Sequence, residues 1–276
     1  MSPEAFGGNN PESFYDEGLT ASMKGDLPKA IQFFEQTIRM DSSMATAYHQ
    51  LGKCYARMGK KDKAVRILAQ VVSKRPKLKA AQIDLGNALI QTGEYEQAIK
   101  QFETVLANNL TDAKALLGLA LADFNRGHWK DALTHAQNAQ MHGGTNFATL
   151  YMVGRAAKLA GNDGLSIRTL EKADQVIAKY QEMNEEKPEG YFLRGEVAFV
   201  KGDYSGAITQ YRSAEERTEL EHSYLAYGET FDMCGILAKQ GLCMQRLDEP
   251  EKAKEIGDRI GRINEKHPLG KALRES

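Results

Sequence analysis

The sequence lacks the features that would place it in several common classes of protein. Its three cysteines form no CxxC pair and leave an odd number, which argues against a disulfide framework or a cysteine metal site. No apolar run approaches the roughly 18 residues of a membrane-spanning helix, so we expect no membrane insertion. The first residues have neither a basic start nor an apolar stretch and do not resemble a secretory signal. This cysteine usage fits a reducing compartment, and we expect a cytoplasmic location.

Motifs that carry chemistry are also missing. The sequence has no GxSxG, GxxxxGK[ST], HExxH or GxGxxG, so it predicts no nucleophile elbow, phosphate loop or zinc pair. His135 and His142 can share a helix face, but seven residues of helix separate them by about 10 Å, too far for one metal ion. We therefore expect no catalytic residue, no metal site and no cofactor, and hence no enzyme.

What the sequence does contain is a repeat. Between Tyr48 and Val72, apolar and small residues recur at helical spacing on both sides of Gly59, as two amphipathic helices joined by a tight turn require. Glycines recur at the turn with a constant step (59 − 25 and 93 − 59 are both 34), at Gly25, Gly59, Gly93, Gly127 and Gly161. Small residues keep the same step in the second helix, at Ala30, Ala64, Ala98, Ala132 and Ser166. A constant period of this length predicts a solenoid of helical hairpins that pack on their neighbours.

This pattern resembles the tetratricopeptide repeat family. Leu51, Gly52 and Tyr55 match the family pattern in the first helix of the second hairpin. Ala64 and Leu68 match it in the second helix. The resemblance covers residues 11–268 and implies an all-α, right-handed superhelical solenoid of seven helix–turn–helix repeats.

The period breaks twice, and these breaks define the expected organisation. The step between first-helix glycines lengthens to 41 from Gly154 to Gly195 (195 − 154) and to 46 from Gly195 to Gly241 (241 − 195). In the last repeat Asp248 replaces the turn glycine. The expected segments are a disordered lead-in at 1–10, five repeats over 11–180, an extended helix or insertion at 181–187, a sixth repeat at 188–221, an insertion helix at 222–233, a seventh repeat at 234–268 and a frayed tail at 269–276.

In the tetratricopeptide repeat family the first helices line a concave groove that binds peptides. The resemblance therefore implies a non-enzymatic adaptor or scaffold that binds one or more proteins. The groove-facing positions are polar in the second repeat and become apolar and aromatic later. The candidate partner-binding residues are Asn87, Leu117, Leu121, Phe124, Asn125, Tyr151, Met152, Arg155, Phe192 and Phe199. Apolar residues at such positions are explained either by a partner helix or peptide, or by internal packing of a tightly curved superhelix.

The charge distribution leaves two alternative functions open. Residues 51–110 hold 11 basic and 5 acidic side chains, a balance of +6, whereas residues 181–276 hold 14 basic and 19 acidic, a balance of −5. These opposite charges predict a homo-oligomer with head-to-tail contacts. The second alternative is nucleic-acid binding through the basic Lys60–Lys79 cluster. That cluster lacks the interleaved aromatic residues that a strand-stacking surface requires, which argues against nucleic acid.

The family resemblance offers one more kind of partner, and an aromatic segment offers one more surface. One subgroup of the family holds the acidic C-terminal tails of chaperones with Lys, Asn and Arg side chains on three successive first helices. The corresponding slots of the first three repeats hold other residues: Tyr15 and Leu19, then Gln50, then Ala80 and Asp84. Chaperone-tail binding is therefore not expected. The aromatic segment from Tyr224 to Phe231 either packs an enlarged joint between repeats or marks a partner site.

Overall fold

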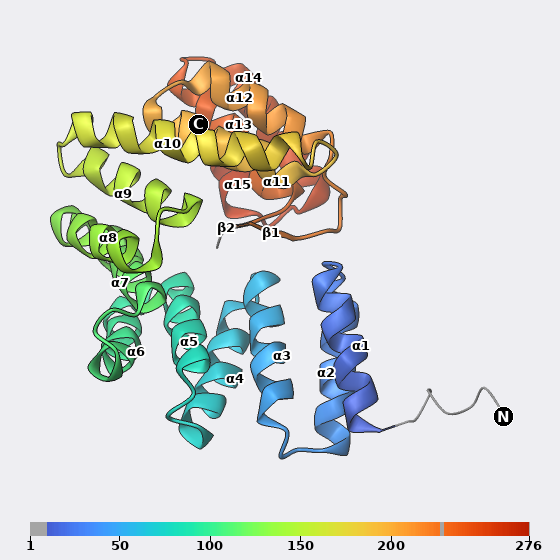
Figure 1. Cartoon of the computed structure of the whole chain (residues 1–276). Coiled ribbons are helices and arrows are strands. Elements are labelled where there is room, and N and C mark those ends of the chain that lie inside the picture. Colours follow the sequence, from blue (N-terminus) through green and yellow to red (C-terminus); the bar gives the residue numbers. More distant parts are fainter. Residues whose placement is uncertain (1–9, 227–228, 276) are drawn as a thin grey trace. The chain divides into compact units, whose positions relative to one another are not determined.

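The computed structural model describes residues 10–226 and 229–275. Within these ranges the chain forms fifteen α-helices and two short strands, and consecutive helices pack in pairs (Figure 1). The expected all-α solenoid of helical hairpins is thus confirmed. Of the expected lead-in, residues 1–9 lie outside the described ranges. Asn10 caps the first helix, because its Oδ1 accepts a hydrogen bond from the Ser13 amide at 2.7 Å.

The chain divides into two compact units, Met1–Gly143 and Gly144–Ser276, each with a hydrophobic core of its own. The helices of unit 1 are α1 (Pro11–Met23), α2 (Leu27–Met40), α3 (Ala45–Arg57), α4 (Lys61–Lys74), α5 (Lys79–Thr92), α6 (Tyr95–Asn108), α7 (Ala113–Asn125) and α8 (Trp129–Gly143). The elements of unit 2 are α9 (Phe147–Leu159), α10 (Asp163–Glu182), α11 (Pro188–Lys201), α12 (Tyr204–Glu215), β1 (Tyr224–Ala226), β2 (Glu229–Phe231), α13 (Met233–Arg246), α14 (Pro250–Ile263) and α15 (Pro268–Glu275).

The turn glycines have the backbone conformation that their position requires. All of them have a positive φ, the region where a Cβ would be strained. The values are 83° at Gly25, 69° at Gly59, 84° at Gly93, 81° at Gly127, 80° at Gly161 and 83° at Gly202. At the seventh hairpin Asp248 takes this place with a φ of 59°. The glycines that recur in the sequence are therefore the turn residues that have a left-handed backbone conformation.

Inside most hairpins a glycine of the first helix lies against a large side chain of the second. A Cβ added at Gly52 would lie only 2.7 Å from Leu68 Cγ. The spacing of the two partners (68 − 52) is the same in every such pair, and the full set is Gly18 with Phe34, Gly52 with Leu68, Gly86 with Phe102, Gly154 with Leu170, and Gly195 with Tyr211. The fourth hairpin instead has Ala120 and Ala136 at these positions, both fully buried. Each hairpin thus keeps its crossing close by limiting the combined size of the two residues.

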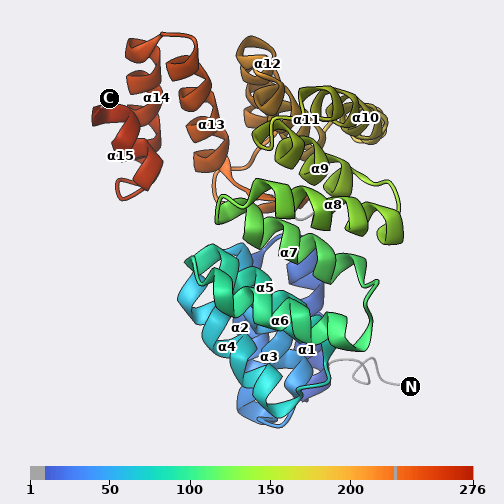
Figure 2. The same cartoon turned by 90° about the vertical axis from the view of Figure 1, so that its left-hand side faces the viewer.

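The residues expected to form a frayed tail form helix α15 instead, so that expectation is wrong. Helix α15 packs against α14 and α13 (Figure 2). The physical reason lies in the seventh hairpin, where both crossing positions, Gly241 and Gly257, are glycine. Leu273 of α15 fills the resulting gap and is 1% exposed, and a Cβ added at either glycine would crowd it. Gly257, which weakens α14 as an isolated helix, and Gly241 of α13 thus admit α15.

The two irregular segments of the sequence have different structures. Helix α10 has 20 residues against 14 in α4 and ends at Glu182, so of the extended helix or insertion expected at 181–187 only residues 181–182 are helical. The insertion helix expected at 222–233 is wrong, because β1 and β2 pair there as an antiparallel hairpin. Tyr224 lies opposite Phe231, and their rings stack with centroids 5.4 Å apart. Such cross-strand aromatic pairs favour strands over a helix. Residues 227 and 228, between the two strands, lie outside the described ranges.

Candidate functional site

The first helices of successive hairpins contact one another directly. In unit 1, α1 contacts α3, α3 contacts α5, and α5 contacts α7; in unit 2, α9 contacts α11. The first helices therefore line the inner face of each unit. We call Asn87, Leu117, Leu121, Phe124 and Asn125 the inner strip of unit 1. We call Tyr151, Met152, Arg155, Phe192 and Phe199 the inner cluster of unit 2. Together they are the ten candidate residues, and each set is described within its own unit.

The inner strip of unit 1 has an apolar centre and polar ends. Leu117, Leu121 and Phe124 are spaced by four and three residues on α7, so they share one helix face, and all three are half-buried. Asn87 on α5 and Asn125 at the end of α7 are exposed. The Asn125 amide donates to the Leu121 carbonyl oxygen at 2.8 Å. The strip therefore presents partly exposed apolar area with an amide group on each side.

The inner cluster of unit 2 is packed mainly by unit 2 itself. Tyr151, Met152 and Phe192 are 5%, 4% and 5% exposed. The Tyr151 ring stacks on Phe147 with centroids 5.4 Å apart, and Phe192 stacks on Phe231 of β2 at 4.0 Å. The strand pair thus covers part of the α11 inner face. These three side chains have intramolecular packing partners, and their contact with another protein stays a prediction.

A buried carboxylate lies among these aromatic residues. Glu196 of α11 is 5% exposed and accepts hydrogen bonds from the Tyr151 hydroxyl at 3.0 Å and the Tyr211 hydroxyl at 2.6 Å. The Lys239 ammonium of α13 lies 2.7 Å from its Oε1. Burial alone would raise the pKa of Glu196, but the charge of Lys239 and these hydrogen bonds hold the pKa below its ordinary value. The carboxylate is therefore ionised and ties α11 to α9, α12 and α13.

Two cations lie over aromatic rings of the inner cluster. The Arg155 guanidinium is 5.2 Å from the Tyr151 ring centroid, and its Nε lies 3.3 Å from Met152 Sδ. Lys239 Nζ lies 5.5 Å from the Phe199 centroid. Cations at this range are attracted to the ring faces. Arg155 and Phe199 are half-buried, so they are the members of the cluster with side chains still reachable from solvent.

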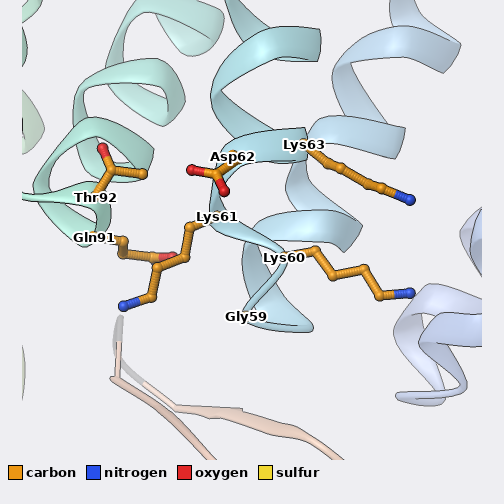
Figure 3. Close-up of a pocket in the computed structure, with 7 residues that line it drawn as sticks. All are labelled: Gly59, Lys60, Lys61, Asp62, Lys63, Gln91 and Thr92. Atoms are coloured by element: carbon orange, nitrogen blue, oxygen red, sulfur yellow. The ribbon is translucent and has the colours of Figure 1, made fainter.

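Three lysines of the basic cluster predicted from the sequence, Lys60, Lys61 and Lys63, line an open hollow in unit 1. The hollow, of about 510 Å³, is lined by Gly59, Lys60, Lys61, Asp62, Lys63, Gln91 and Thr92 (Figure 3). Lys60 and Lys63 extend away from the side on which Lys61 approaches Gln91. They lie 6.0 Å and 5.4 Å from the Tyr55 ring centroid. Tyr55 is therefore an aromatic neighbour of these two lysines that the sequence spacing did not indicate. Tyr55 is 7% exposed, however, and offers no ring face for a stacked base.

Sequence reasoning missed two polar contacts of the inner faces. His49 Nε2 lies 2.7 Å from Asp84 Oδ2, and these residues are one repeat plus one residue apart. The signal in the sequence was that both residues occupy groove-facing positions of consecutive repeats. Glu196 and Lys239 lie on either side of an irregular step, so no periodic pattern connects them.

The part of the chain that the structure describes offers no metal site, membrane-spanning helix or reactive thiol. No cluster of three or more His, Cys, Asp or Glu side chains there has a geometry suited to a metal ion. None of the described helices combines the length and apolar character needed to cross a bilayer. Cys54, Cys234 and Cys243 are buried and form no disulfide. Burial raises the pKa of all three thiols, that of Cys243 to about 12, which opposes their use as nucleophiles.

Comparisons with known proteins point to one fold. The family model described as Tetratricopeptide repeat matches residues 22–82 and 62–116. No curated protein sequence matches the chain. A tetratricopeptide repeat protein from Parabacteroides merdae ATCC 43184 has a TM-score of 0.60 at 15% identity, over 97% of this chain and 98% of that one. A chain of the APC/C hetero-tetramer Cut9–Hcn1 has a TM-score of 0.60 at 14% identity, over 99% and 50%. MamA from Desulfovibrio magneticus RS-1 has a TM-score of 0.53 at 18% identity, over 62% and 97%. At these identities the similarity shows the fold alone.

Proposed function

Because this chain is a tetratricopeptide repeat protein, we propose that it is a non-enzymatic scaffold that binds another protein on the inner strip of unit 1. The observation that carries this proposal is the partly exposed apolar face of α7. Leu117, Leu121 and Phe124 form a continuous stripe there that their own hairpin leaves half-covered. The similarity to a subunit of the Cut9–Hcn1 hetero-tetramer supports a role in assembly at the level of the fold.

The shape of the strip favours a helix or extended peptide with apolar anchors. Side chains spaced by three and four residues on α7 match the spacing of anchors along a partner helix. The exposed side-chain amides of Asn87 and Asn125 would bond a ligand backbone, Asn125 through its Oδ1, because its amide nitrogen donates to Leu121. In unit 2, Arg155 and Phe199 are proposed as secondary contacts because they retain exposure. The cytoplasmic location remains a prediction from cysteine usage.

Affinity capture by the full chain, followed by mass spectrometry and titration, tests this proposal. Phe124→Ala should weaken the captured partner by about 2 kcal/mol, or roughly 30-fold, if Phe124 is an interaction hot spot. Leu133→Ala is the matched control, because Leu133 is also half-buried but lies on the second helix α8. The control should retain the partner.

Three results would contradict the proposal. If Phe124→Ala lowers the melting temperature strongly but leaves partner affinity unchanged, the side chain serves internal packing. If the partner is lost equally from Leu133→Ala, the loss reflects a general change in the fold. A small metabolite that strongly stabilises the chain at low concentration would favour a small-molecule site instead.

A further inference from the structure

Unit 1 carries a band of positive charge along α4 and its flanking turns. Between residues 60 and 79 there are eight Lys or Arg side chains and a single acidic one, Asp62. Lys79 pairs with Asp112 at 2.8 Å. The other seven form what we call the basic band: Lys60, Lys61, Lys63, Arg66, Lys74, Arg75 and Lys77. All seven are exposed, and among the described residues none of them has a carboxylate partner.

Unit 2 carries the opposite charge on two adjacent turns. We call the six exposed glutamates at the ends of α10 and α12 the acidic edge: Glu182, Glu185, Glu186, Glu216, Glu219 and Glu221. The two turns touch, because Arg217 Nε donates to the Glu185 carbonyl oxygen at 2.7 Å. Glu216 and Glu219 have ion pairs at 3.5 Å and 3.7 Å with Arg217 and His222. The other four glutamates have no ion pair within the described part of the chain.

Each patch is electrostatically incomplete without an oppositely charged surface. Like charges gathered on one face repel one another, and a complementary patch attracts them over the screening distance. We propose that the basic band of one copy of this chain docks on the acidic edge of a second copy. A nucleic acid would account for the basic band and would leave the acidic edge without a role. A second copy accounts for both patches.

The proposed contact joins two different surfaces, so a dimer held by one such contact leaves one band and one edge unused. Such heterologous contacts propagate into open chains or close into rings. The contact involves exposed charges, and it should therefore weaken steeply with salt. The screening length falls from about 30 Å at 0.01 M to about 3 Å at 1 M.

Sedimentation of the full chain at two salt concentrations gives the first measurement. At about 0.01 M salt we expect particles of at least twice the 30.6 kDa chain mass, and at about 1 M salt we expect the single chain. A chain that remains at 30.6 kDa at low salt overturns the proposal. Steep salt-dependent binding of single-stranded DNA or RNA by that single chain, lost in Lys61→Glu/Lys63→Glu, would assign the band to nucleic acid.

A charge exchange between the two patches gives the decisive measurement. Lys61→Glu/Lys63→Glu and Glu185→Lys/Glu186→Lys should each remain single chains at low salt, and an equimolar mixture of the two should assemble again. Both variants are compatible with the fold. Acidic residues suit the first turn of α4, and basic ones suit the residues after α10.

The matched control for charge is Lys114→Glu/Lys130→Glu, which changes the net charge by the same amount as the double lysine variant. Its two exposed lysines lie on α7 and α8, outside the basic band. This control should assemble like the parent. If it disperses as well, or if mixing the two exchanged variants fails to restore the particle, the specific docking of band on edge is wrong.

Discussion

The inner faces of the two units differ in how completely the chain covers its own apolar side chains. In unit 1, where the glycine step is constant, Leu117, Leu121 and Phe124 remain half-buried. In unit 2, where the steps lengthen, Tyr151 and Phe192 are 5% exposed. For Phe192 the cover is Phe231 of the inserted strand pair, whereas Tyr151 stacks on Phe147 of its own helix. The comparison shows that an inserted segment can pack over apolar side chains of the inner face that a partner protein would otherwise cover.

The cover of unit 2 combines aromatic stacking with one buried charge pair. Phe231 of the inserted strand pair lies on Phe192, and the rings of Tyr224 and Phe231 extend the stack. In the same cluster, Glu196 joins α9, α12 and α13 through Tyr151, Tyr211 and Lys239. Unit 1 has a simpler inner contact, the pair of His49 and Asp84. The inner face of unit 2 is therefore specified by a network of buried polar contacts around one carboxylate, whereas in unit 1 separate contacts join neighbouring first helices, His49 with Asp84 and Arg57 with Ser22.

The largest expected effect comes from removing the cation of the buried pair. Lys239→Met should lower the free energy of unfolding at pH 7 by about 3–5 kcal/mol, because it leaves Glu196 buried with no opposing charge. Urea unfolding, with hydrogen exchange followed in α11 and α13, measures this loss. Lys252→Met is the control, because the exposed Lys252–Glu249 pair of the same unit should contribute less than about 1 kcal/mol.

The pH dependence of this variant identifies the cause. In the parent the pKa of Glu196 is below its ordinary 4.5, so its stabilisation is full above that pH and is lost as the pH falls through the lowered pKa. In Lys239→Met burial raises the pKa of Glu196, so acidification protonates and relieves it. The stability gap between variant and parent should therefore narrow from pH 7 towards 4.5. A gap that is independent of pH would mean that lost packing is responsible.

The next effect concerns the fourth hairpin, whose crossing is formed by Ala120 and Ala136 instead of a glycine and a large side chain. Ala136→Leu should destabilise unit 1 by about 1–3 kcal/mol through overpacking against Ala120. Adding Ala120→Gly should recover most of that loss, less about 1 kcal/mol for a glycine inside a helix. Thermal or urea unfolding of both variants and of Ala120→Gly alone completes the cycle. Additive losses would show that these two positions do not share one crossing.

The regular part of the fold was predictable because its determinants are local and repeated. Gly25, Gly59 and Gly93 mark turns that require a positive φ, and amphipathic spacing between them defines the helices. Helix α15 was not predictable from its own residues. It is short, contains Gly270, and is held by Leu273 in a gap left by two distant glycines. The β1–β2 pair was missed for a similar reason, because three-residue strands are too short for a clear alternation.

The sequence predicted which helices carry the candidate residues, but it did not predict how exposed their side chains are. Spacing alone places Phe124, Tyr151 and Phe192 on first helices. Their burial depends on what the rest of the chain lays over them, and for Phe192 that is Phe231, which lies beyond the whole of α12 in the sequence. No periodic pattern carries this information. The charged patches were visible in the sequence, but their lack of ion-pair partners required the structure.

The smallest expected effect concerns the turn of the seventh hairpin, where Asp248 stands in place of a glycine. Asp248 has a φ of 59°, which costs a residue with a Cβ up to about 1–2 kcal/mol relative to glycine. Asp tolerates this region better than most residues, so Asp248→Gly should stabilise unit 2 by about 1 kcal/mol or less. The reverse change, Gly93→Asp, should destabilise unit 1 by a similar amount. A Cβ at Gly93 would meet no atom within 4 Å, so backbone strain is the only cost there. Melting curves of both variants measure these changes in stability. If neither change alters stability, the positive φ of these turns is maintained without strain, and the glycine period must reflect another requirement.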